Sequence, residues 1–411
     1  MQQVMQYIRD NLPETFRPAN DYTPYPFVSP TVDKQYRDFY YWDTYFQNLG
    51  LMLLGHLDYA ESDLDNIAYA IEKYGYMPNA LVWHSLDRSQ PPFFTRMVWS
   101  YYRFCHDDLH ILEKYITPIL REHDFWVNRR GCAFGLCSYG CEAAGDDLIK
   151  SGYQHHTRVQ ESADTPEGQR LIGRNLLAIA ESGLDFNMRF RTADSNISAD
   201  RFVHLDLNCI LYEAETLTAR MLSLLGRAEE AAVYAEFARR RKEAVNTHLF
   251  DASQGIYLDR NFADGSFSRI LSQASLYPYA FGLSDDSEGA ARVLSRLELP
   301  YGVSACEYRG EDDLYFQWDY PCIWPAATLL SYQALVRAGL TADARRIAEK
   351  YMAAVDRNFA ETGRLWEKYD GRDGSVAVTS EYATPPFFGW TAAVYVVLER
   401  ELYEGGCGSH A

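Results

Sequence analysis

Apolar runs of helical length recur along most of this chain, and this repetition restricts the possible folds more than any other feature. The runs are separated by short breaks rich in Gly, Pro, Asn or Asp. Stretches that alternate like strands are few and short, the best being 255–259 and 364–367. Twelve candidate helices cover residues 38–56, 60–74, 92–104, 107–128, 167–182, 205–225, 227–248, 269–282, 286–297, 319–336, 340–356 and 388–402.

No polar linker or low-complexity segment divides these runs. An amphipathic helix needs a partner for its apolar face, and closing six helical hairpins into a ring gives every hairpin two neighbours. We therefore predict an all-α protein in which residues 36–403 form a single catalytic domain, an (α/α)6 barrel. Residues 1–35, a short helix followed by a Pro-rich segment, are expected to form an N-terminal arm, and residues 404–411 a tail.

The composition favours a small neutral partner. The formal net charge of −18 disfavours nucleic acid, whose phosphates require Lys and Arg, and also an anionic membrane surface. The 31 Tyr, 21 Phe and 8 Trp suit stacking on sugar rings, although they fit a large core equally well. No signal-peptide core opens the sequence and no run reaches transmembrane length, so we expect a cytoplasmic protein.

The eight cysteines do not form a recognisable metal site. Cys132, Cys137 and Cys141 cluster in a Gly-rich stretch, but without the paired Cys-x-x-Cys spacing of a zinc site. Reduced thiols are the favoured interpretation in a cytosolic setting, with a local disulfide or a metal as alternatives. No metal and no cofactor are predicted.

Asp185 is the most conspicuous candidate for a working side chain. It lies in the segment 181–190, where Gly183 is expected to end the helix 167–182, and its neighbours Leu184 and Phe186 are apolar. A side chain at such a junction is either a capping or solvated aspartate or part of a site held by the end of a helix. The other motifs of the chain favour the second interpretation.

Two motifs in the first quarter of the chain combine aromatic and polar side chains between predicted helices. Trp42 and Asp43 lie where a helix starts, so Asp43 is either an N-cap or a carboxylate that holds sugar hydroxyls beside a Trp platform. Arg88, Ser89 and Gln90 precede two prolines that would start the next helix. They either anchor a loop or supply directed hydrogen-bond donors to a ligand.

Three later motifs are similar in character. The adjacent His155 and His156 would point in different directions on most backbones, so a metal site there is improbable. The segments 315–325 and 365–370 precede or connect predicted helices, and a Gly/Asp-rich loop beyond residue 370 has the composition of a mobile lid. The candidate residues in these segments and just after them are Arg158, Glu161, Gln317, Trp318, Asp319, Glu367, Glu381 and Trp390.

The chemistry that these motifs suit best is glycoside hydrolysis by two carboxyl groups. The sequence has no recognisable Ser-His-Asp elbow, phosphate-binding Gly loop or metal spacing. One carboxyl group would protonate the leaving oxygen, while the other would activate water or attack directly. The apolar neighbours of Asp185 suit a general acid, whose pKa must be raised. The residues alone leave inversion and retention of the anomeric configuration equally open.

The motifs together resemble the α,α-trehalases, glycoside hydrolase family 37, over roughly residues 33–400. The resemblance is carried by Tyr40-Tyr-Trp-Asp-x-Tyr-Phe46, Met77-Pro-Asn79, Arg88-Ser-Gln-Pro-Pro-Phe93, Glu181-Ser-Gly-x-Asp-Phe186, Gln317-Trp-Asp-Tyr-Pro321, Glu367-Lys-Tyr-Asp370 and Gly389-Trp-Thr391. It implies an (α/α)6 barrel and an inverting α-glucosidase without a cofactor. It also implies that Asp185 is the general acid, Glu367 the general base and Glu381 a glutamate of the lid. The sugar-binding positions that it implies are Trp42, Asp43, Asn79, Arg88, Ser89, Gln90 and Gly183.

The chain departs from the family pattern at several positions. Gln35 stands where the family has Arg, Leu184 where it has Trp, and 377–380 where it has a glycine-rich lid. The Arg-Pro-Glu motif of the family is present only loosely as Arg158-Val-Gln-Glu161. We therefore expect trehalose or a close α-glucoside as substrate. The further candidates for binding it are Gln35, Arg37, Arg158, Glu161, Gln317, Trp318, Asp319 and Trp390.

Three alternatives remain open on these residues. In the first, the pocket serves a glucosyl- or mannosylglycerate, as in the related family 63, and Arg158 or Arg309 meets the acidic aglycone. In the second, the protein binds a sugar without turning it over. The third is an epimerase or isomerase on the same barrel, which would need paired histidines, and His155 and His156 are the candidates for these.

Overall fold

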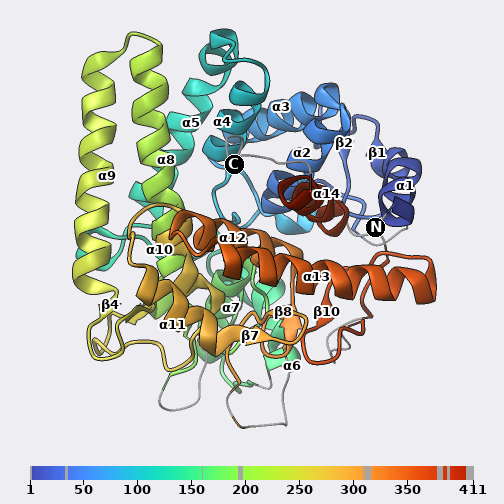
Figure 1. Cartoon of the computed structure of the whole chain (residues 1–411). Helices are drawn as coiled ribbons and strands as arrows, with labels where there is room; N and C mark the ends of the chain where they lie inside the picture. Colours follow the sequence, from blue (N-terminus) through green and yellow to red (C-terminus); the bar gives the residue numbers. More distant parts are fainter. Residues whose placement is uncertain are drawn as a thin grey trace.

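The computed structural model describes residues 2–32, 36–159, 161–192, 198–308, 310, 316–376, 383–386 and 389–403. Within these residues, six helices contact one another in chain order and the last contacts the first, so that they close a ring (Figure 1). The prediction of an all-α (α/α)6 barrel is confirmed. The helices of the inner ring are α2 (Tyr41–Leu54), α4 (Phe94–Phe104), α8 (Leu205–Leu224), α10 (Tyr277–Ala280), α12 (Pro325–Arg337) and α14 (Gly389–Tyr403).

A second layer of helices surrounds the ring. Its members are α1 (Gln2–Asn11), α3 (Leu57–Tyr74), α5 (Leu109–Arg129), α9 (Ala228–His248), α11 (Ser287–Leu297) and α13 (Thr341–Thr362). Helices α3, α5, α9 and α13 each pack on the inner helix that precedes them in the chain. Gly55 and Gly75 end α2 and α3 in the left-handed conformation, which glycine adopts at no steric cost. The chain can therefore reverse within a few residues and form hairpins.

The N-terminal residues pack onto this double layer. The ring of Tyr7 lies 5.0 Å from that of Phe359 in α13, and Val4 and Ile8 are buried in the main core. Further along, the side chain of Asp63 in α3 accepts a hydrogen bond from the backbone N–H of Val28. Residues 2–28 thus share the core of the ring, while the division of the whole chain into arm, domain and tail stays a prediction.

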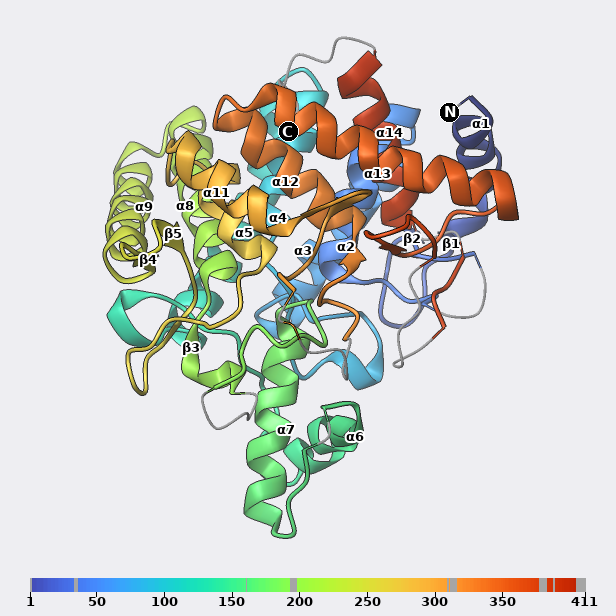
Figure 2. The ribbon, with the colours of Figure 1, turned by 60° about the horizontal axis from the view of Figure 1, so that its bottom comes forward.

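Helix α7 (Pro166–Glu181) does not belong to the ring, contrary to our expectation for the run 167–182. It projects from the ring together with α6 (His156–Val159) (Figure 2). The π-helical turn Leu148–Gly152 packs on α7 at Gly173, where a Cβ would collide with the carbonyl oxygen of Leu148. The apolar periodicity of α7 therefore reflects the burial of one face of this helix against short turns. Helix α1, and not α7, completes the outer layer of the ring.

Two inner helices are shorter than the sequence predicted. The run 269–282 forms a 3-10 turn, Gln273–Leu276, and then the four-residue helix α10. The run 319–336 becomes helical only at Pro325, the first residue of α12, because a proline is favoured at the first helical position and not inside a helix. The residues ahead of α12 are therefore free to form part of a pocket.

The described strands are pairs of two residues, all antiparallel. They pair as β1 (Phe16–Arg17) with β2 (Phe27–Val28), β3 (Phe202–Val203) with β6 (Arg260–Asn261), β4 (Phe250–Asp251) with β5 (Ile256–Tyr257), β7 (Glu298–Leu299) with β8 (Gly302–Val303) and β9 (Cys322–Ile323) with β10 (Tyr369–Asp370). The predicted strand 255–259 contains β5. The predicted strand 364–367 forms an isolated β-bridge, between Trp366 and Pro386. Among the described helices, none combines the length and apolar character needed to cross a membrane.

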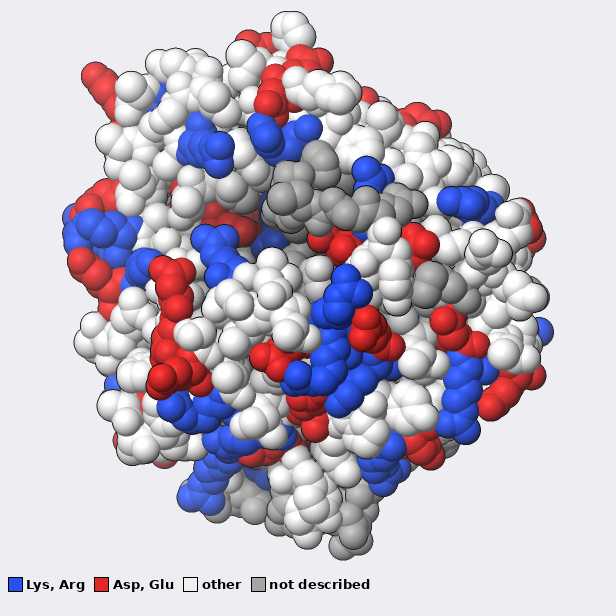
Figure 3. Space-filling view, viewed as in Figure 1, with Lys and Arg blue, Asp and Glu red and all other residues white. Residues whose placement is uncertain are grey.

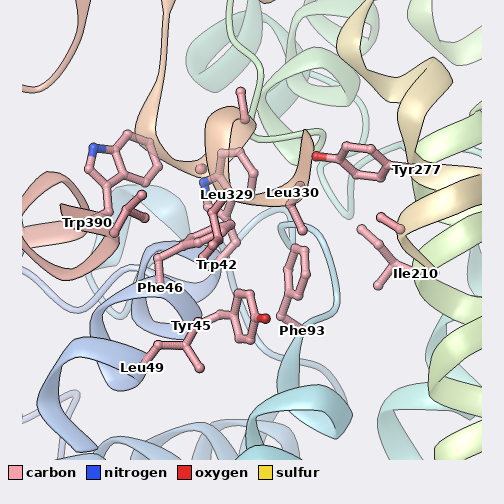
Figure 4. Close-up of a cluster of buried hydrophobic side chains, with 14 of the residues drawn as sticks. Trp42, Tyr45, Phe46, Leu49, Phe93, Ile210, Tyr277, Leu329, Leu330 and Trp390 are labelled. Carbon is pink, nitrogen blue, oxygen red and sulfur yellow. The ribbon is translucent and has the colours of Figure 1, made fainter. Parts of the chain in front are cut away.

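A layer of aromatic side chains fills the axis of the ring (Figure 4). Tyr45 stacks on Phe93 with 4.7 Å between the ring centroids, and Phe46 contacts both Phe93 and Trp42. All four rings are at most 2% exposed. The barrel is therefore plugged along its axis, and any cavity must lie on one side or the other of this aromatic layer.

Candidate active site

A pocket of about 470 Å³ opens where α2, α12 and α14 begin. It gathers segments that lie far apart in the sequence, including the loop before α4 and the loop that follows α7. The predicted site residues that line it are Trp42, Asp43, Asn79, Arg88, Gln90, Arg158, Gly183, Asp185, Trp318, Glu367 and Trp390. The other described residues of its lining are Tyr36, Tyr40, His84, Ser85, Ser151, Gln154, His155, Leu177, Ala180, Phe186 and Trp324.

Four tryptophans form the floor of the pocket. Trp318 stacks on Trp324 at 3.8 Å, while Trp42 and Trp390 meet edge to face at 5.7 Å. Three of them begin or immediately precede an inner helix, so the packing of the ring fixes their positions. The indole N–H of Trp324 donates to the carbonyl of Gln317, which orients that ring. Aromatic faces of this kind stack on the C–H faces of sugars.

The loop 86–90 forms one side of the pocket and is fixed to the start of α2. The backbone N–H of Trp42 donates to the side-chain oxygen of Gln90, and the N–H of Asn79 donates to the carbonyl of Arg88. Ser89 is turned away from the pocket, because its hydroxyl donates to the carbonyl of Met77. Asn79, Arg88 and Gln90 therefore present polar atoms to the pocket, whereas Ser89 holds their loop.

Glu181 supports this side of the pocket from below, a role that we did not predict. Its carboxylate is fully buried and accepts two hydrogen bonds from Arg130, at 2.7 Å each. It also accepts from the backbone N–H groups of Ser89 and Gly140. The residue stands in the motif Glu181-Ser-Gly, so the sequence contained the signal. Both carboxylate oxygens of Glu181 accept hydrogen bonds. This buried ion pair therefore fixes three segments relative to one another: the loop 86–90, residues 130–140 and the end of α7.

Asp185 reaches the pocket from the loop after α7. Gly183, at φ +71°, lets this loop turn against the indole of Trp42, where a Cβ would lie 2.9 Å from the ring. The loop is held from the other side by Gln317, whose amide donates to the carbonyl of Asp185, and by Asp319, which accepts from the N–H of Met188. Gln317 and Asp319 thus position the loop and do not line the pocket.

The surroundings of Asp185 favour its protonated form. Burial raises the pKa of this carboxyl group, and the nearby carboxylate of Glu367 acts in the same direction. The guanidinium groups of Arg158 and Arg88 oppose the shift without reversing it. Burial also raises the pKa of Asp43, to about 8, with Glu367 and Asp185 contributing. Three carboxyl groups therefore lie close enough to influence one another in one pocket.

Glu367 differs from Asp185 in having a cation in direct contact. Lys368 Nζ lies 2.6 Å from Glu367 Oε2, and its ammonium group also lies over the ring of Trp324. The backbone N–H of Glu367 donates to the carbonyl of Pro385, and the residue is 3% exposed. The pocket therefore holds two carboxyl groups whose pKa is raised, Asp185 and Asp43, and a third, Glu367, in direct contact with an ammonium group.

The outer wall of the pocket comes from the projecting unit. Ser151, Gln154, His155 and Arg158 line it. The guanidinium of Arg158 lies 4.4 Å from the ring centroid of Phe186, and burial together with the charges of Arg158 and Arg88 lowers the pKa of His155 to about 4. Apart from Arg158, we had named His155 only as a partner of His156 for an epimerase or isomerase, and we did not predict Ser151 or Gln154. Their spacing of three or four residues, which places side chains on one helical face, was the available signal.

The remaining predicted residues lie elsewhere. Arg37 is exposed and its guanidinium approaches the carbonyl of Val32, and Glu161 does not line the pocket. Gln35, Glu381 and the alternative cation Arg309 fall outside the described residues. Cys132, Cys137 and Cys141 carry free thiols. Within the described ranges, no three His, Cys, Asp or Glu side chains are placed to hold a metal ion.

The barrel and its tryptophan-floored pocket with several carboxyl groups are typical of a glycoside hydrolase. A family model described as Trehalase matches residues 4–402, and the chain belongs to the trehalase family of glycoside hydrolases. The periplasmic trehalase of Xanthomonas axonopodis pv. citri is 32% identical over 405 residues, which cover 93% of this chain and 69% of that protein. The resemblance to trehalases that the motifs indicated is confirmed.

Two solved structures show the same fold. The neutral trehalase of Saccharomyces cerevisiae superposes with a TM-score of 0.74 at 21% identity, covering 99% of this chain and 80% of the yeast chain. The GH63 mannosylglycerate hydrolase of Thermus thermophilus in complex with glucose gives a TM-score of 0.68 at 16% identity, covering 96% of this chain and 99% of that one.

The relatives contradict one prediction. We expected a cytoplasmic protein, but the Xanthomonas relatives are named periplasmic trehalases. The prediction rested on the first residues of the sequence and on its lack of a long apolar run, and neither property distinguishes the cytoplasm from the periplasm for a mature chain.

Proposed function

We propose that this protein hydrolyses α,α-trehalose, or a closely similar small α-glucoside, with inversion of the anomeric configuration. Asp185 is the general acid and Glu367 the general base. The observation that carries the proposal is the contrast between these two carboxyl groups in one pocket. Burial favours the protonated form of Asp185, while Glu367 is ion-paired with Lys368. Two carboxyl groups whose environments differ in this way are what acid and base roles require.

The binding of a neutral sugar follows from the same pocket. One glucose ring would lie against the floor formed by Trp42 and Trp390, where stacking requires no charge. Its hydroxyl groups would exchange hydrogen bonds with Asp43, Asn79 and Gln90, which supply both donors and acceptors. The second glucose would face the outer wall, towards Arg158.

The reaction needs one water molecule and no covalent intermediate. Glu367 takes a proton from water as the water oxygen attacks the anomeric carbon, and Asp185 gives its proton to the glycosidic oxygen as the bond between carbon and oxygen breaks. One glucose leaves in the β form, from the attacked carbon, and the other in the α form. Glu367 then returns its proton to solvent and Asp185 recovers one, which restores both groups.

A second candidate is hydrolysis of an α-glycoside with an acidic aglycone. Arg88 and Arg158 both lie near enough to Asp185 to influence its pKa, so a carboxylate on the leaving group would meet two cations. Relative kcat/KM values for trehalose, glucosylglycerate and mannosylglycerate separate the two candidates. Trehalose is expected to be the best substrate of the three.

The roles of the two carboxyl groups can be tested by changing the leaving group. On trehalose, both Asp185→Asn and Glu367→Gln should lower kcat by about 10³-fold or more. On α-glucosyl fluoride, whose leaving group needs no protonation, Asp185→Asn should recover most of its activity and Glu367→Gln should not. The exposed Glu243→Gln serves as a control and should leave kcat unchanged on both substrates.

Other outcomes would refute the assignments. Recovery by Glu367→Gln instead of Asp185→Asn would exchange the two roles. If the wild type bound trehalose in a calorimeter but released no glucose from any α-disaccharide, the protein would be a sugar-binding relative and not an active hydrolase.

A further inference from the structure

Lys368 differs from the other lysines of the chain because its charge is buried. Charged side chains of both signs are spread over the face shown in Figure 3, where water surrounds them. Lys368 is 0% exposed, and among the lysines that the structure describes it is the only buried one. Lysine is almost never fully buried unless its charge is paired, because an ammonium group loses its hydration on burial. The partners of Lys368 therefore indicate its role.

The ammonium group of Lys368 contacts three residues of the candidate active site. Its Nζ lies 2.6 Å from Glu367 Oε2 and 3.4 Å from the side-chain oxygen of Gln317. It also lies 4.9 Å from the ring centroid of Trp324, a cation–π contact with the floor of the pocket. Lys368 and Gln317 are not among the described residues that line the pocket. Lys368 therefore acts on a bound substrate only through its partners.

Gln317 connects Lys368 to the loop of Asp185. The side-chain oxygen of Gln317 accepts from Lys368, and its amide group donates to the carbonyl of Asp185. An ammonium group only donates and a carbonyl group only accepts, so one orientation of the amide satisfies both partners. The backbone of Gln317 is held as well, because its carbonyl accepts from the indole N–H of Trp324 at 2.7 Å. The position of Lys368 is thus transmitted to the loop that carries Asp185.

We propose that Lys368 is a positioning residue for both catalytic carboxyl groups. It holds Glu367 directly through the ion pair, and it holds Asp185 indirectly through Gln317. The inference rests on the proposed roles of Glu367 as base and Asp185 as acid. One ammonium group then sets the position of the base relative to the loop of the acid. Both groups must be oriented at the same moment for the reaction, and small misplacements are costly.

The first part of the test replaces two side chains by methionine, which is similar to both in size and cannot donate a hydrogen bond. Lys368→Met should lower kcat for trehalose about 100-fold or more, and Gln317→Met about ten-fold. Both should change KM by less than about two-fold, because the replaced groups do not touch the substrate. Lys350→Met is the matched control, since it breaks a pair with Glu298 at 2.7 Å outside the pocket and should leave kcat unchanged.

The second part uses α-glucosyl fluoride to separate the effect on the acid from the effect on the base. Its leaving group needs no protonation, so Gln317→Met, which acts on the acid, should recover most of its activity. Lys368→Met also acts on the base and should not recover. On trehalose, the double variant should lose less activity than the product of the two single losses, because both substitutions break the same connection to Asp185.

Recovery of both variants on the fluoride, recovery of neither, or fully multiplicative losses on trehalose would overturn the inference. If Lys368→Met does not fold, as judged by tryptophan fluorescence, Lys368→Gln takes its place with the same expected pattern. Asp185→Asn and Glu367→Gln are measured alongside on both substrates. If these two do not differ on the fluoride, the proposed function fails; if they differ and Lys368→Met recovers, only the role of Lys368 fails.

Discussion

The floor and the outer wall of the candidate active site are built in different ways. The floor consists of four tryptophans, three of them at the start of inner helices, at most 3% exposed and packed on one another. The wall consists of polar side chains on short turns beside α7, outside the ring. The floor is therefore part of the barrel core, while the wall is an addition to it. We infer that the chemistry depends on the floor and that recognition of the leaving group depends on the wall.

The two regions also differ in how they are anchored. Behind the floor, Glu181 and Arg130 form a buried ion pair that joins the loop 86–90 to the end of α7. The wall is held by the contact of the π-helical turn with α7 and by exposed pairs such as Arg170 with Asp146. Surface ion pairs contribute little to stability, whereas breaking a buried pair leaves a charge without compensation.

The largest expected effect is therefore on the anchor of the floor. Glu181→Gln removes one of the two carboxylates that pair with the buried Arg130, leaving Glu142, and should lower the free energy of unfolding by about 3 kcal/mol. The measurement is the denaturant midpoint followed by tryptophan fluorescence. Asp146→Asn, which breaks the exposed pair of the wall, is the matched control and should leave the midpoint unchanged. Equal effects of the two substitutions would contradict the comparison.

A smaller effect is expected where the floor meets the loop of Asp185. In Gly183→Ala, the new Cβ meets Trp42, and the left-handed backbone costs roughly 1 kcal/mol more for alanine than for glycine. Because Trp42 or Asp185 must move, kcat should fall about ten-fold or more, since small misplacements at a site are costly. The comparison is Gly363→Ala, which has a similar φ of +68° but no atom within 4 Å of its Cβ. It should lose similar stability and keep its kcat.

The wall should affect the pH dependence of the reaction more than its maximum rate. Arg158 lowers the pKa of Asp185, so Arg158→Met should raise that pKa. Asp185 would then keep its proton to higher pH, and the basic limb of kcat/KM should move upward. His155→Gln is the control, because a histidine with a pKa of about 4 is neutral across this range and its loss should not move the limb.

Asp43 provides a second check on the same limb. Its pKa of about 8 places it among the groups that titrate in the pocket. Asp43→Asn removes that titration, while Arg158→Met acts on Asp185. If only Asp43→Asn changes the basic limb, then the limb does not report Asp185, and Asp185 loses this support for its role as the acid.

The smallest effects are expected for the polar residues at the edge of the wall. Ser151→Ala and Gln154→Ala should change kcat/KM for trehalose by about two- to five-fold, in line with single hydrogen bonds. They should leave kcat/KM for 4-nitrophenyl α-glucoside unchanged, because its flat aglycone cannot make the same bonds. A loss of both activities would mean that the wall supports the floor and is not specific for the leaving group.

The barrel could be predicted because its helices follow the periodicity of their own residues. The run 205–225 became α8, and 388–402 became α14, since both bury long, mostly apolar runs in the ring. Helix α7 has the same apolar pattern but packs on short turns, and such turns leave no periodic pattern in the sequence. The pattern shows that a face is buried but not what covers it, so the projecting unit and its residues Ser151 and Gln154 were missed, and His155 was considered only as a partner of His156.

The floor of the site was more accessible to prediction than its wall or its supports. Trp42, Trp318 and Trp390 stand in motifs that the chain shares with trehalases, and they do line the pocket. Ser89 and Asp319 stand in the same motifs but hold loops through hydrogen bonds. A motif does not distinguish a residue that faces the ligand from one that faces the backbone behind it. That difference depends on the side-chain rotamer and on the packing of distant segments.

The most direct test of the central claim is the anomeric form of the glucose first released from α,α-trehalose, followed by proton NMR before mutarotation. Inversion by Asp185 and Glu367 predicts equal amounts of α- and β-glucose in the first spectra, because only the attacked ring changes configuration. Release of α-glucose alone would show retention. It would require a carboxylate that attacks the sugar, and would contradict the assignment of Glu367 as a general base.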